Sequence, residues 1–408
     1  MSAMDQQPLP ARTQVGIVGA GPAGLLLGRL LELQGIETVV IEARTQEYVQ
    51  KRVRAGLLEQ GTVDLMIETG VGERLKREAL PQRGLEFRFA GQRHRIPVTE
   101  LTGGKRVNVY GQQEVVKDLV HARRESGAPL LFEAPVVEVA GIDTDAPVIR
   151  YREGEEIREL RCDVVAGCDG FHGVARHAVP AGVMTERGCE YPYGWLGILA
   201  DAPPSNDEII YAWHERGMAL HSMRSPEVSR LYIQCAPDED LAKWTDDQIW
   251  DELEARLAID DDWTLNRGPI REKGVTGMRS FVLEPMQYGR LYLAGDAAHI
   301  VPPTGAKGLN LAAADVRTLA AALTAWFAGG DESLLDAYSA TCLERIWRAQ
   351  HNATWLTKLL HRSPDAGDMD ARLQLAELEY VCTSPAGRTM IAENYVGLDP
   401  VRWLTDDG

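Results

Sequence analysis

The sequence predicts an α/β fold in which a doubly wound parallel sheet is interrupted by a second, largely antiparallel sheet and followed by a helical C-terminal region. A strand, a glycine-rich turn and a helix follow one another from Thr13, strand-like segments alternate between about Glu190 and Leu283, and helical periodicity dominates thereafter. We expect a nucleotide-binding domain over 13–189, an inserted sheet domain over 190–283, and the return of the first domain with the C-terminal helices over 284–398. Residues 1–12 and 399–408 are expected to be tails, the first of them flexible.

The length and charge of the chain limit its partners. Its 408 residues, 45% of them hydrophobic, exceed the size at which one core divides into two packed domains. A net charge of −17 argues against nucleic acid and against an anionic membrane surface, because both select basic faces. A small anionic substrate therefore has to meet locally placed arginines.

Cysteine spacing and hydropathy point to a cytoplasmic protein with no membrane segment. The six cysteines lack metal or redox spacing and are expected to be reduced, and we expect no metal site. The N-terminus lacks the pattern of a signal peptide. The most apolar helical stretch, Leu309 to Ala328, contains Asp315 and Arg317, so we expect it to be a packed helix.

The first strand leads into the turn Gly19-Ala-Gly21-Pro-Ala-Gly24, which gives the predicted domain its Rossmann-like character. Free N–H groups at the start of the following helix can hold a pyrophosphate, and side chains in the turn would block its approach. Glu42 ends the next strand, at the spacing expected of a carboxylate that binds an adenosine ribose. The pattern predicts dinucleotide binding but does not distinguish FAD from NAD.

Other segments extend both sheets. A strand near Val107 that becomes a helix after Gln112, and a short apolar run over Cys162–Ala166, fit the doubly wound sheet, and Gly289–Asp296 returns to the same pattern. Inside the insertion, three segments alternate as antiparallel strands do: Glu208–Trp213, Met218–Met223 and Ser229–Gln234.

Two later motifs favour FAD. Flavoprotein hydroxylases resemble this chain in carrying both Cys168-Asp169-Gly170 and Gly295-Asp296, in this order and at strand ends. In that family Asp296 holds the ribityl chain of FAD, and the Asp169-Gly170 pair lies near the pyrophosphate. Either dipeptide taken alone would be an ordinary turn.

Three longer motifs carry a closer resemblance: Arg52 to Gly61, Gly295 to Asn310, and Ala392 to Leu398. The chain resembles, from about Val15 to Leu398, the para-hydroxybenzoate 3-hydroxylases of the class A FAD-dependent aromatic hydroxylase family. The resemblance implies that Arg54, Gln112 and Asp296 contact FAD. It also implies that the helix start near Leu309 and Asn310 lies against the flavin pyrimidine edge, where N–H donors would offset the negative charge of reduced flavin. We interpret His299 in this motif as a structural imidazole.

The inserted sheet carries the expected substrate residues. Ser222 and Arg224 lie two apart and so project from one face of a strand, and the resemblance assigns them, with Tyr232, to a benzoate carboxylate. A guanidinium flanked by hydroxyls suits that anion, although Arg224 taken alone would more often be a surface ion-pair residue.

Tyr211 and Tyr395 match the pair that contacts the substrate phenol in this family, with the carbonyl of Pro303 nearby. Ring hydroxylation is an electrophilic attack that favours a phenolate, and a phenol with a pKa near 10 needs placed hydrogen bonds and a proton path to ionise. Without the resemblance, either tyrosine would be a half-buried core ring. The sequence departs from the family at Gln82, where the resemblance places a histidine at the outer end of the proton path. Glutamine does not titrate, so either a water takes over the exit or the local alignment over Pro81 to Gly84 is off by one residue. We expect slower or differently pH-dependent proton release.

The stretch Ala43 to Arg52 matches the region that governs the choice of reduced nicotinamide. Arg44, Tyr48 and Arg52 are candidates for this site, and Arg44, Lys51 and Arg52 can meet a 2′-phosphate. Because Ala43 replaces a basic residue associated with NADPH preference, NADPH is favoured while NADH stays open. Arg230 matches a residue tied to flavin movement.

The resemblance implies hydroxylation of 4-hydroxybenzoate to 3,4-dihydroxybenzoate with FAD, NAD(P)H and O2, by a homodimer. A close analogue such as 3,4-dihydroxybenzoate is an alternative substrate, because few pocket contacts discriminate one hydroxyl. A flavin oxidase, or a flavin-fold binding protein without chemistry, is the alternative from another class.

Overall fold

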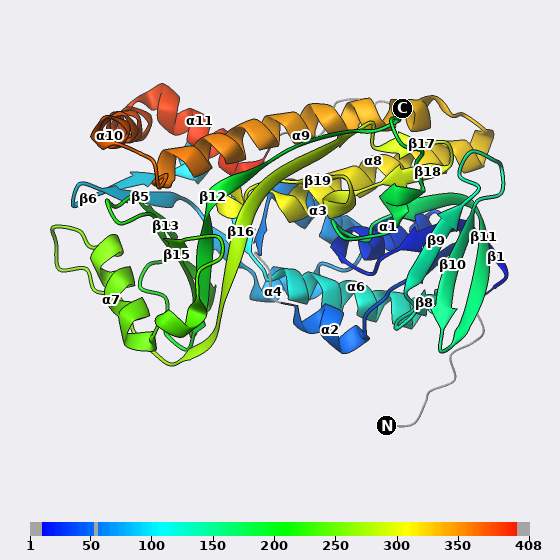
Figure 1. Cartoon of the computed structure of the whole chain (residues 1–408), viewed down its shortest axis with the longest axis horizontal. Coiled ribbons are helices and arrows are strands. Elements are labelled where there is room, and N and C mark those ends of the chain that lie inside the picture. The colour runs from blue at the N-terminus through cyan, green and yellow to red at the C-terminus, as the bar shows by residue number, and fades with distance from the viewer. Residues whose placement is uncertain (1–9, 53–55, 398–408) are drawn as a thin grey trace.

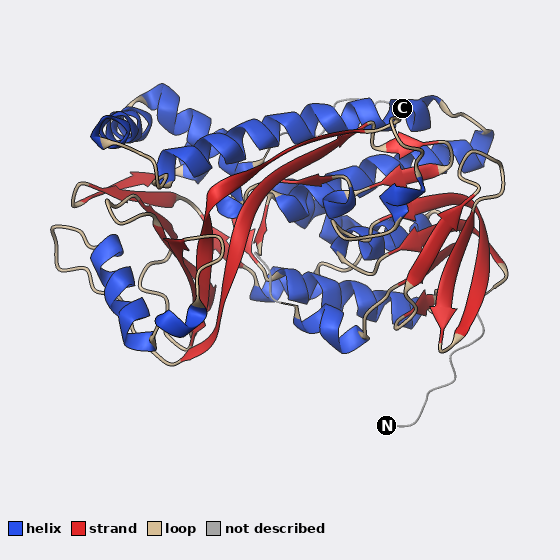
Figure 2. Ribbon diagram, in the orientation of Figure 1, coloured by secondary structure: helices blue, strands red, loops and turns tan. Residues whose placement is uncertain are grey.

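A computed structural model describes residues 10–52 and 56–397 of the chain. The described part is elongated, with one large sheet at each end and a layer of helices between and above them (Figure 1). Figure 2 shows two long strands that run diagonally across the middle of the view. These strands are β12 (Thr185–Ala200) and β16 (Ile270–Glu284).

The first sheet has the strand order β17-β18-β11-β1-β2-β8. Its central strands are parallel, and they are buried toward their carboxyl ends, as expected where both faces of the sheet are covered. Helices α1 (Pro22–Leu33) and α6 (Gln112–Ser126) pack beside them. The strands are β1 (Arg12–Val18), β2 (Thr38–Ile41), β8 (Leu130–Leu131), β11 (Glu156–Gly167), β17 (Gln287–Tyr288) and β18 (Leu291–Leu293), with β9 (Val136–Ala140) and β10 (Val148–Glu153) attached antiparallel to β11.

The second sheet has the order β19-β16-β12-β15-β14-β13-β5-β6 and is antiparallel except where β13 pairs with β5. All three strands expected between 190 and 283 form. The sheet also recruits β5 and β6, which come from 85–96, and β12 begins at Thr185, because an open sheet edge pairs with whichever strand is near in space. The remaining strands are β5 (Leu85–Phe89), β6 (Gln92–Ile96), β13 (Ile209–Ala212), β14 (Ala219–Ser225), β15 (Val228–Cys235) and β19 (His299–Ile300).

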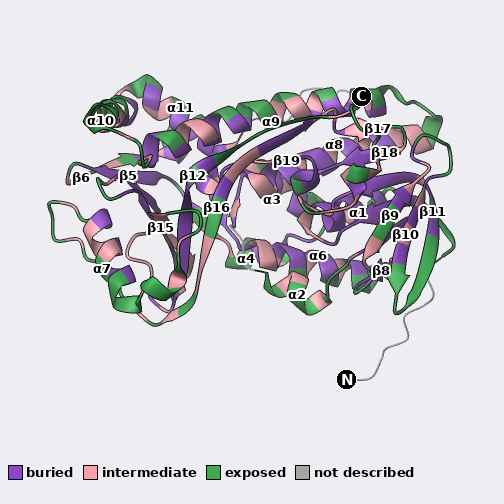
Figure 3. Ribbon diagram, viewed as in Figure 1, coloured by how far each residue is buried: buried purple, intermediate pink, exposed green. Residues whose placement is uncertain are grey.

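The two faces of the second sheet pack against different layers. Helix α7 (Asp246–Leu257) covers one face through a core that includes Ile210, Leu231 and Ile233. The opposite face packs against the C-terminal helices through a core that includes Phe87, Tyr211 and Leu220. Figure 3 shows this inner part of the sheet as buried.

Small elements connect the two sheets. The strand expected near Val107 forms, but it belongs to a separate three-stranded sheet, β3-β7-β4, and not to the doubly wound sheet. Its short length and its two antiparallel neighbours explain this difference. The elements are α2 (Gln46–Lys51), β3 (Leu57–Leu58), α3 (Gln60–Glu68), α4 (Glu73–Glu78), β4 (Leu80–Gln82), α5 (Val98–Leu101) and β7 (Val107–Val109).

The C-terminal region is helical, as expected, and consists of α8 (Gly308–Gly329), α9 (Ser333–Leu360), α10 (Asp368–Thr383) and α11 (Pro385–Val396). Among the described residues, α8 alone is long and apolar enough by composition to cross a membrane, and 56% of that stretch is buried inside the protein. It packs against α1 and α9. Burial of Asp315 and Val316 in the middle of α8 is typical of a core helix.

Candidate active site

Three motifs meet at one edge of the first sheet. Gly19, Cys168-Asp169 and Gly295-Asp296 each follow the carboxyl end of a parallel strand, and these strands, β1, β11 and β18, are neighbours. Cys168 donates its backbone N–H to the carbonyl of Val18 (2.8 Å). This edge is where ligands bind in open α/β sheets.

The glycine turn fits a close backbone approach. A Cβ on Gly19, whose φ is +104°, would lie 2.4 Å from the carbonyl oxygen of Cys168, and one on Gly24 would lie 2.0 Å from that of Gly19. These two glycines are therefore required by the packing of the turn itself. A Cβ on Gly21 would meet nothing within 4 Å, so this position faces open space in front of helix α1. A pyrophosphate fits there.

The carboxylate of Glu42 is fixed at the edge of this turn. One oxygen accepts the N–H of Ala20 and the other accepts the N–H of Arg44, each at 2.8 Å. Each oxygen retains a second lone pair that can accept a ribose hydroxyl. The geometry fits the expected dinucleotide.

Asp296 and its neighbours differ sharply in burial. Asp296 is exposed, whereas Gly295 and Ala297 beside it are buried. The N–H of Gly295 and Nε2 of His299 both bond to Oδ2 of buried Asp315, at 2.9 and 2.6 Å. Burial lowers the pKa of His299, but the attraction of Asp315 outweighs it and the pKa is raised. His299 thus has the structural surroundings expected of it, and Asp296 is presented outward.

The start of α8 is held by a buried polar network. The amide of Asn310 accepts the N–H of Glu59 (2.9 Å) and the hydroxyl of Thr62 (2.8 Å) and donates to the carbonyl of Leu57 (3.0 Å). Lys307 binds the Glu59 carboxylate at 2.7 Å and also reaches backbone carbonyls of α11. Because the Asn310 side chain is fully engaged, the donors that remain at this helix start, beside Leu309, are backbone N–H groups.

Gln112 begins helix α6 and is partly buried. Arg54, the other expected flavin contact, lies outside the described residues. The neighbouring Gln113, which sequence reasoning missed, accepts a 2.9 Å hydrogen bond from Arg224 of the second sheet. No local signal predicts this contact, because 111 residues separate the partners.

The expected substrate residues gather on one face of the second sheet. Tyr211 pairs with Leu220 across β13 and β14, Leu220 pairs with Tyr232 across β14 and β15, and Ser222 pairs with Arg230. Directly paired residues project to the same face of a sheet, so these strands present two tyrosines and a serine together. This is the face that packs toward the C-terminal helices.

Arg224 departs from simple alternation. The register of β14 and β15 shifts between Met223 and Ser225, so Arg224 is the extra residue of a β-bulge, which re-aims a side chain. Its guanidinium reaches α6 at Gln113. Burial lowers the pKa of Arg224, and the nearby Tyr232 opposes this effect. The Tyr232 hydroxyl in turn accepts a 3.1 Å bond from Arg230, and its ring packs 4.6 Å from that of Trp195.

The two candidate catalytic tyrosines lie beside the Pro303 loop. The Tyr211 hydroxyl donates to the carbonyl of Thr304, directly after Pro303, at 2.8 Å. The Tyr395 hydroxyl is buried and has no hydrogen-bond partner among the described residues. Both tyrosines line a small cavity of about 20 Å³, and burial raises the pKa of each. They are thus placed together, with their protons retained near neutral pH.

Gln82 is buried and fully engaged. Its Nε2 donates to the carbonyl of Asp207 and its Oε1 accepts the N–H of Ile209, both at 3.0 Å. It therefore holds the peptide groups on either side of Glu208, at the start of β13. This bracing role is another that sequence reasoning missed.

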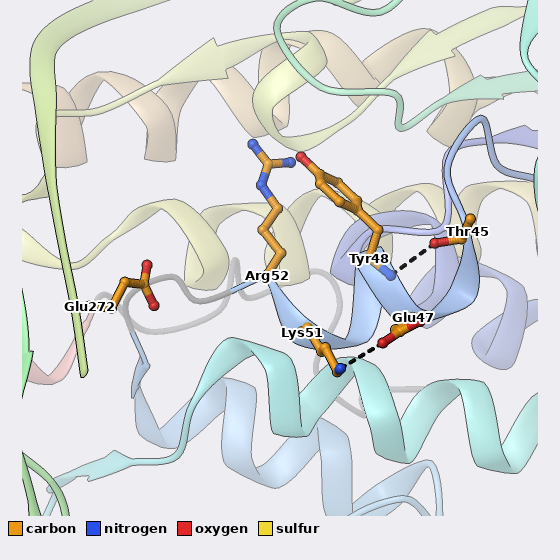
Figure 4. Close-up of a pocket in the computed structure, with 6 residues that line it drawn as sticks. All are labelled: Thr45, Glu47, Tyr48, Lys51, Arg52 and Glu272. Atoms are coloured by element: carbon orange, nitrogen blue, oxygen red, sulfur yellow. Dashed lines mark hydrogen bonds and ion pairs between the residues drawn. The ribbon is translucent and has the colours of Figure 1, made fainter. Parts of the chain in front are cut away.

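A cavity lies between α2 and β16. It measures about 490 Å³ and is lined by Tyr48, Lys51 and Arg52 of the α2 region and by Glu272 of β16, together with Thr45 and Glu47 (Figure 4). The guanidinium of Arg44 stacks 5.4 Å from the centre of the Tyr48 ring. Arg230 lies elsewhere, on β15 of the second sheet.

The parallel sheet, the glycine turn and the inserted antiparallel sheet define a flavoprotein of the FAD-binding class. Residues 12–353 match the family model described as FAD binding domain, and a p-hydroxybenzoate hydroxylase from Acinetobacter baylyi is 48% identical over 95% of this chain and 96% of its own length. The chain belongs to the p-hydroxybenzoate hydroxylase family, and its cofactor is FAD, with NAD(P)H as co-substrate.

More distant relatives agree with the fold. A probable NADH-specific resorcinol 4-hydroxylase from Rhodococcus jostii is 27% identical over 83% of this chain and 64% of its own length. The structure of the p-nitrophenol 4-monooxygenase PnpA from Pseudomonas putida superposes with a TM-score of 0.81 at 20% identity, covering 95% of this chain and 99% of that one. The expected α/β architecture is confirmed.

Proposed function

We propose that this chain hydroxylates 4-hydroxybenzoate to 3,4-dihydroxybenzoate, using FAD, NAD(P)H and O2. The proposal follows from the p-hydroxybenzoate hydroxylase that is 48% identical over nearly its whole length. It agrees with a sheet face that offers a cation, Arg224, at one end and Tyr211, close to Tyr395 of α11, at the other. The alternative substrates and the non-catalytic alternative have no observation in their favour.

Within the structure, the observation that supports the proposal best is the shared face of β13, β14 and β15. Ser222 and Tyr232 supply hydroxyls there, and the bulge brings the guanidinium of Arg224 beside Tyr232. A benzoate carboxylate would bind Arg224 and these hydroxyls through charge-assisted hydrogen bonds. The ring would then extend toward Tyr211, which places the phenol near the Pro303 loop.

In this proposal Tyr211 exchanges its hydrogen bond. Without substrate it donates to the Thr304 carbonyl; with substrate it would bond to the phenol oxygen, and the carbonyl of Pro303 would lie nearby. Tyr395 would receive the proton from Tyr211 and pass it on. Burial protects both hydroxyls from ionising themselves, so they hold and transfer a proton rather than carry charge.

The residues present fit FAD. The pyrophosphate and ribose would bind at the turn of Gly19, Gly21 and Gly24 and at Glu42. The ribityl chain would bind Asp296. The isoalloxazine region would contact Gln112 and the start of α8 at Leu309 and Asn310, and Arg54 is proposed as a flavin contact from the resemblance alone. Bound FAD would accept a hydride from NAD(P)H and activate O2. Arg230 would support movement of the flavin through its contacts on β15.

We assign nicotinamide binding to the cavity beside α2. Arg44, Tyr48 and Arg52 would contact the adenosine part of the dinucleotide, and the cations favour the 2′-phosphate of NADPH over NADH. The free thiols of all six cysteines agree with a cytoplasmic setting.

We also propose a homodimer that uses helix α10. Met369, Leu373 and Tyr380 are 69%, 56% and 62% exposed, and their spacing places them on one side of this helix. Large apolar side chains exposed along one helix face are typical of an interface.

The test of the catalytic proposal is an oxidation assay of NADPH and NADH against a panel of benzoates, with products identified. We expect 4-hydroxybenzoate to stimulate cofactor oxidation and to give 3,4-dihydroxybenzoate. Cofactor oxidation that yields only hydrogen peroxide with every benzoate would overturn the proposal.

A further inference from the structure

Two opposite charges line the cavity between α2 and β16. Arg52 directly follows α2, with its guanidinium beside the Tyr48 ring, and Glu272 projects into the cavity from β16 (Figure 4). Neither residue forms an ion pair with any residue in 10–52 or 56–397. The other cation of the cavity, Lys51, is already paired with Glu47 at 2.6 Å.

A ligand anion that enters this cavity therefore meets one cation and one carboxylate that have no ion-pair partner within 10–52 and 56–397. The adenosine ends of NADPH and NADH differ only at the 2′ position, where NADPH carries a phosphate of about −1.5 to −2 charge. That phosphate is attracted by Arg52 and repelled by Glu272, whereas a ribose 2′-hydroxyl feels little of either. In a partly solvated cavity, charges several ångströms apart still change binding several-fold.

We propose that Glu272 is a specificity-determining residue for the reduced nicotinamide, because its carboxylate opposes the binding of a 2′-phosphate at Arg52. This inference rests on the proposed nicotinamide site. According to this inference, the second sheet takes part in selecting the reductant, although the cations that line the cavity, Lys51 and Arg52, lie in and next to α2. The preference of the protein for NADPH over NADH is accordingly weaker than it would be with the cations of the cavity and without Glu272.

The test compares two probes that differ only in the phosphate: 2′,5′-ADP and 5′-ADP, titrated calorimetrically into the FAD-loaded protein. We expect Glu272→Gln to bind 2′,5′-ADP about threefold to tenfold more tightly and 5′-ADP within twofold of the wild type. The gain should shrink in 0.5 M NaCl, because screening weakens the repulsion. The control Glu155→Gln changes the net charge equally at an exposed turn outside the cavity and should change neither affinity.

Kinetics give an independent readout. In Glu272→Gln, the KM for NADPH should fall by the same factor, with the KM for NADH and both kcat values unchanged. An equal change for both probes, or no change for either, would overturn the inference. If the wild type fails to oxidise NADPH or NADH with 4-hydroxybenzoate, the proposed function fails, while the two ADP titrations still decide the role of Glu272.

Discussion

The hydroxyl of Tyr211 donates a 2.8 Å hydrogen bond to the carbonyl of Thr304, which joins the substrate sheet to the loop before α8. The bond links two segments 93 residues apart in a fully buried setting. It places a phenolic proton at the boundary between the second sheet and the loop that leads into α8.

Tyr211→Phe should mainly damage chemistry. Without the hydroxyl, a bound phenol loses its placed hydrogen-bond partner, and we expect hydroxylation to slow about 100-fold while cofactor oxidation continues. The ratio of dihydroxylated product to NAD(P)H consumed measures this uncoupling. Tyr191→Phe is the control, since Tyr191 is also buried and bonds Ser280 and Thr354 at 3.0 Å; it should lose stability without uncoupling. Full coupling in Tyr211→Phe would contradict the assignment.

Arg224→Ala should weaken benzoate binding. Loss of charge-assisted bonds to a carboxylate costs about 2–3 kcal/mol, which corresponds to a roughly 30- to 150-fold higher Kd for 4-hydroxybenzoate. Titration of the flavin absorbance with substrate measures this. Arg216→Ala removes an exposed arginine that pairs with Glu252 on the same domain and should bind normally. An unchanged Kd in Arg224→Ala would remove this residue from the carboxylate site.

Gln82→His tests the departure from the family. An imidazole titrates near 6.5 and would add a pH dependence near neutrality to phenol deprotonation, which glutamine does not provide. Stopped-flow absorbance of the bound substrate measures the rate against pH. Gln82→Met is the control, because methionine also loses the hydrogen bonds to Asp207 and Ile209 but does not titrate. It separates an effect on proton transfer from an effect of losing the bonds that hold the start of β13. A pH–rate profile of Gln82→His identical to the wild type would reject the idea.

Acid should destabilise the protein through His361. This imidazole accepts a 2.7 Å bond from Trp195, and burial lowers its pKa to about 4 from an ordinary value of 6.5. Below pH 6.5 this imidazole therefore takes up a proton in the unfolded chain but stays neutral in the folded protein. The contribution of His361 to the free energy of unfolding is complete above pH 6.5, and it falls by up to roughly 3 kcal/mol as the pH approaches 4. In His361→Gln, the difference in unfolding free energy between pH 7 and pH 4.5 should shrink by a comparable amount. His121→Gln, at an exposed position, should leave that difference intact.

Leu373→Glu should dissociate the proposed homodimer. A charge in the centre of an apolar interface costs several kcal/mol unless it is paired. Light scattering at micromolar concentration should give the mass of one chain, 45.0 kDa, for this variant and twice that for the wild type. Ile157→Glu, at a residue 50% exposed on β11, should remain dimeric. A wild-type protein of one chain would overturn the interface.

Several features were determined by the sequence because they are local. Gly19, Gly24 and Glu42 predict the dinucleotide turn through the spacing of neighbouring residues, and the strand pieces around Tyr211, Ser222 and Tyr232 follow from alternation. Long motifs such as Gly295 to Asn310 identified the family. Each of these signals lies within a few tens of residues.

Only the tertiary structure decided the relationships that depend on packing between distant segments. Three such relationships join residues that are 111 or more positions apart in the chain. They are the bulge that turns Arg224 toward Gln113, the pairing of β13 with β5, and the hydrogen bond from Ile209 to Gln82. Side-chain alternation fixes which face a residue occupies but not which element covers that face. For the same reason, the presence of Arg52 and Glu272 in one cavity appears only when α2 and β16 are folded together, since each charge alone is an ordinary surface residue.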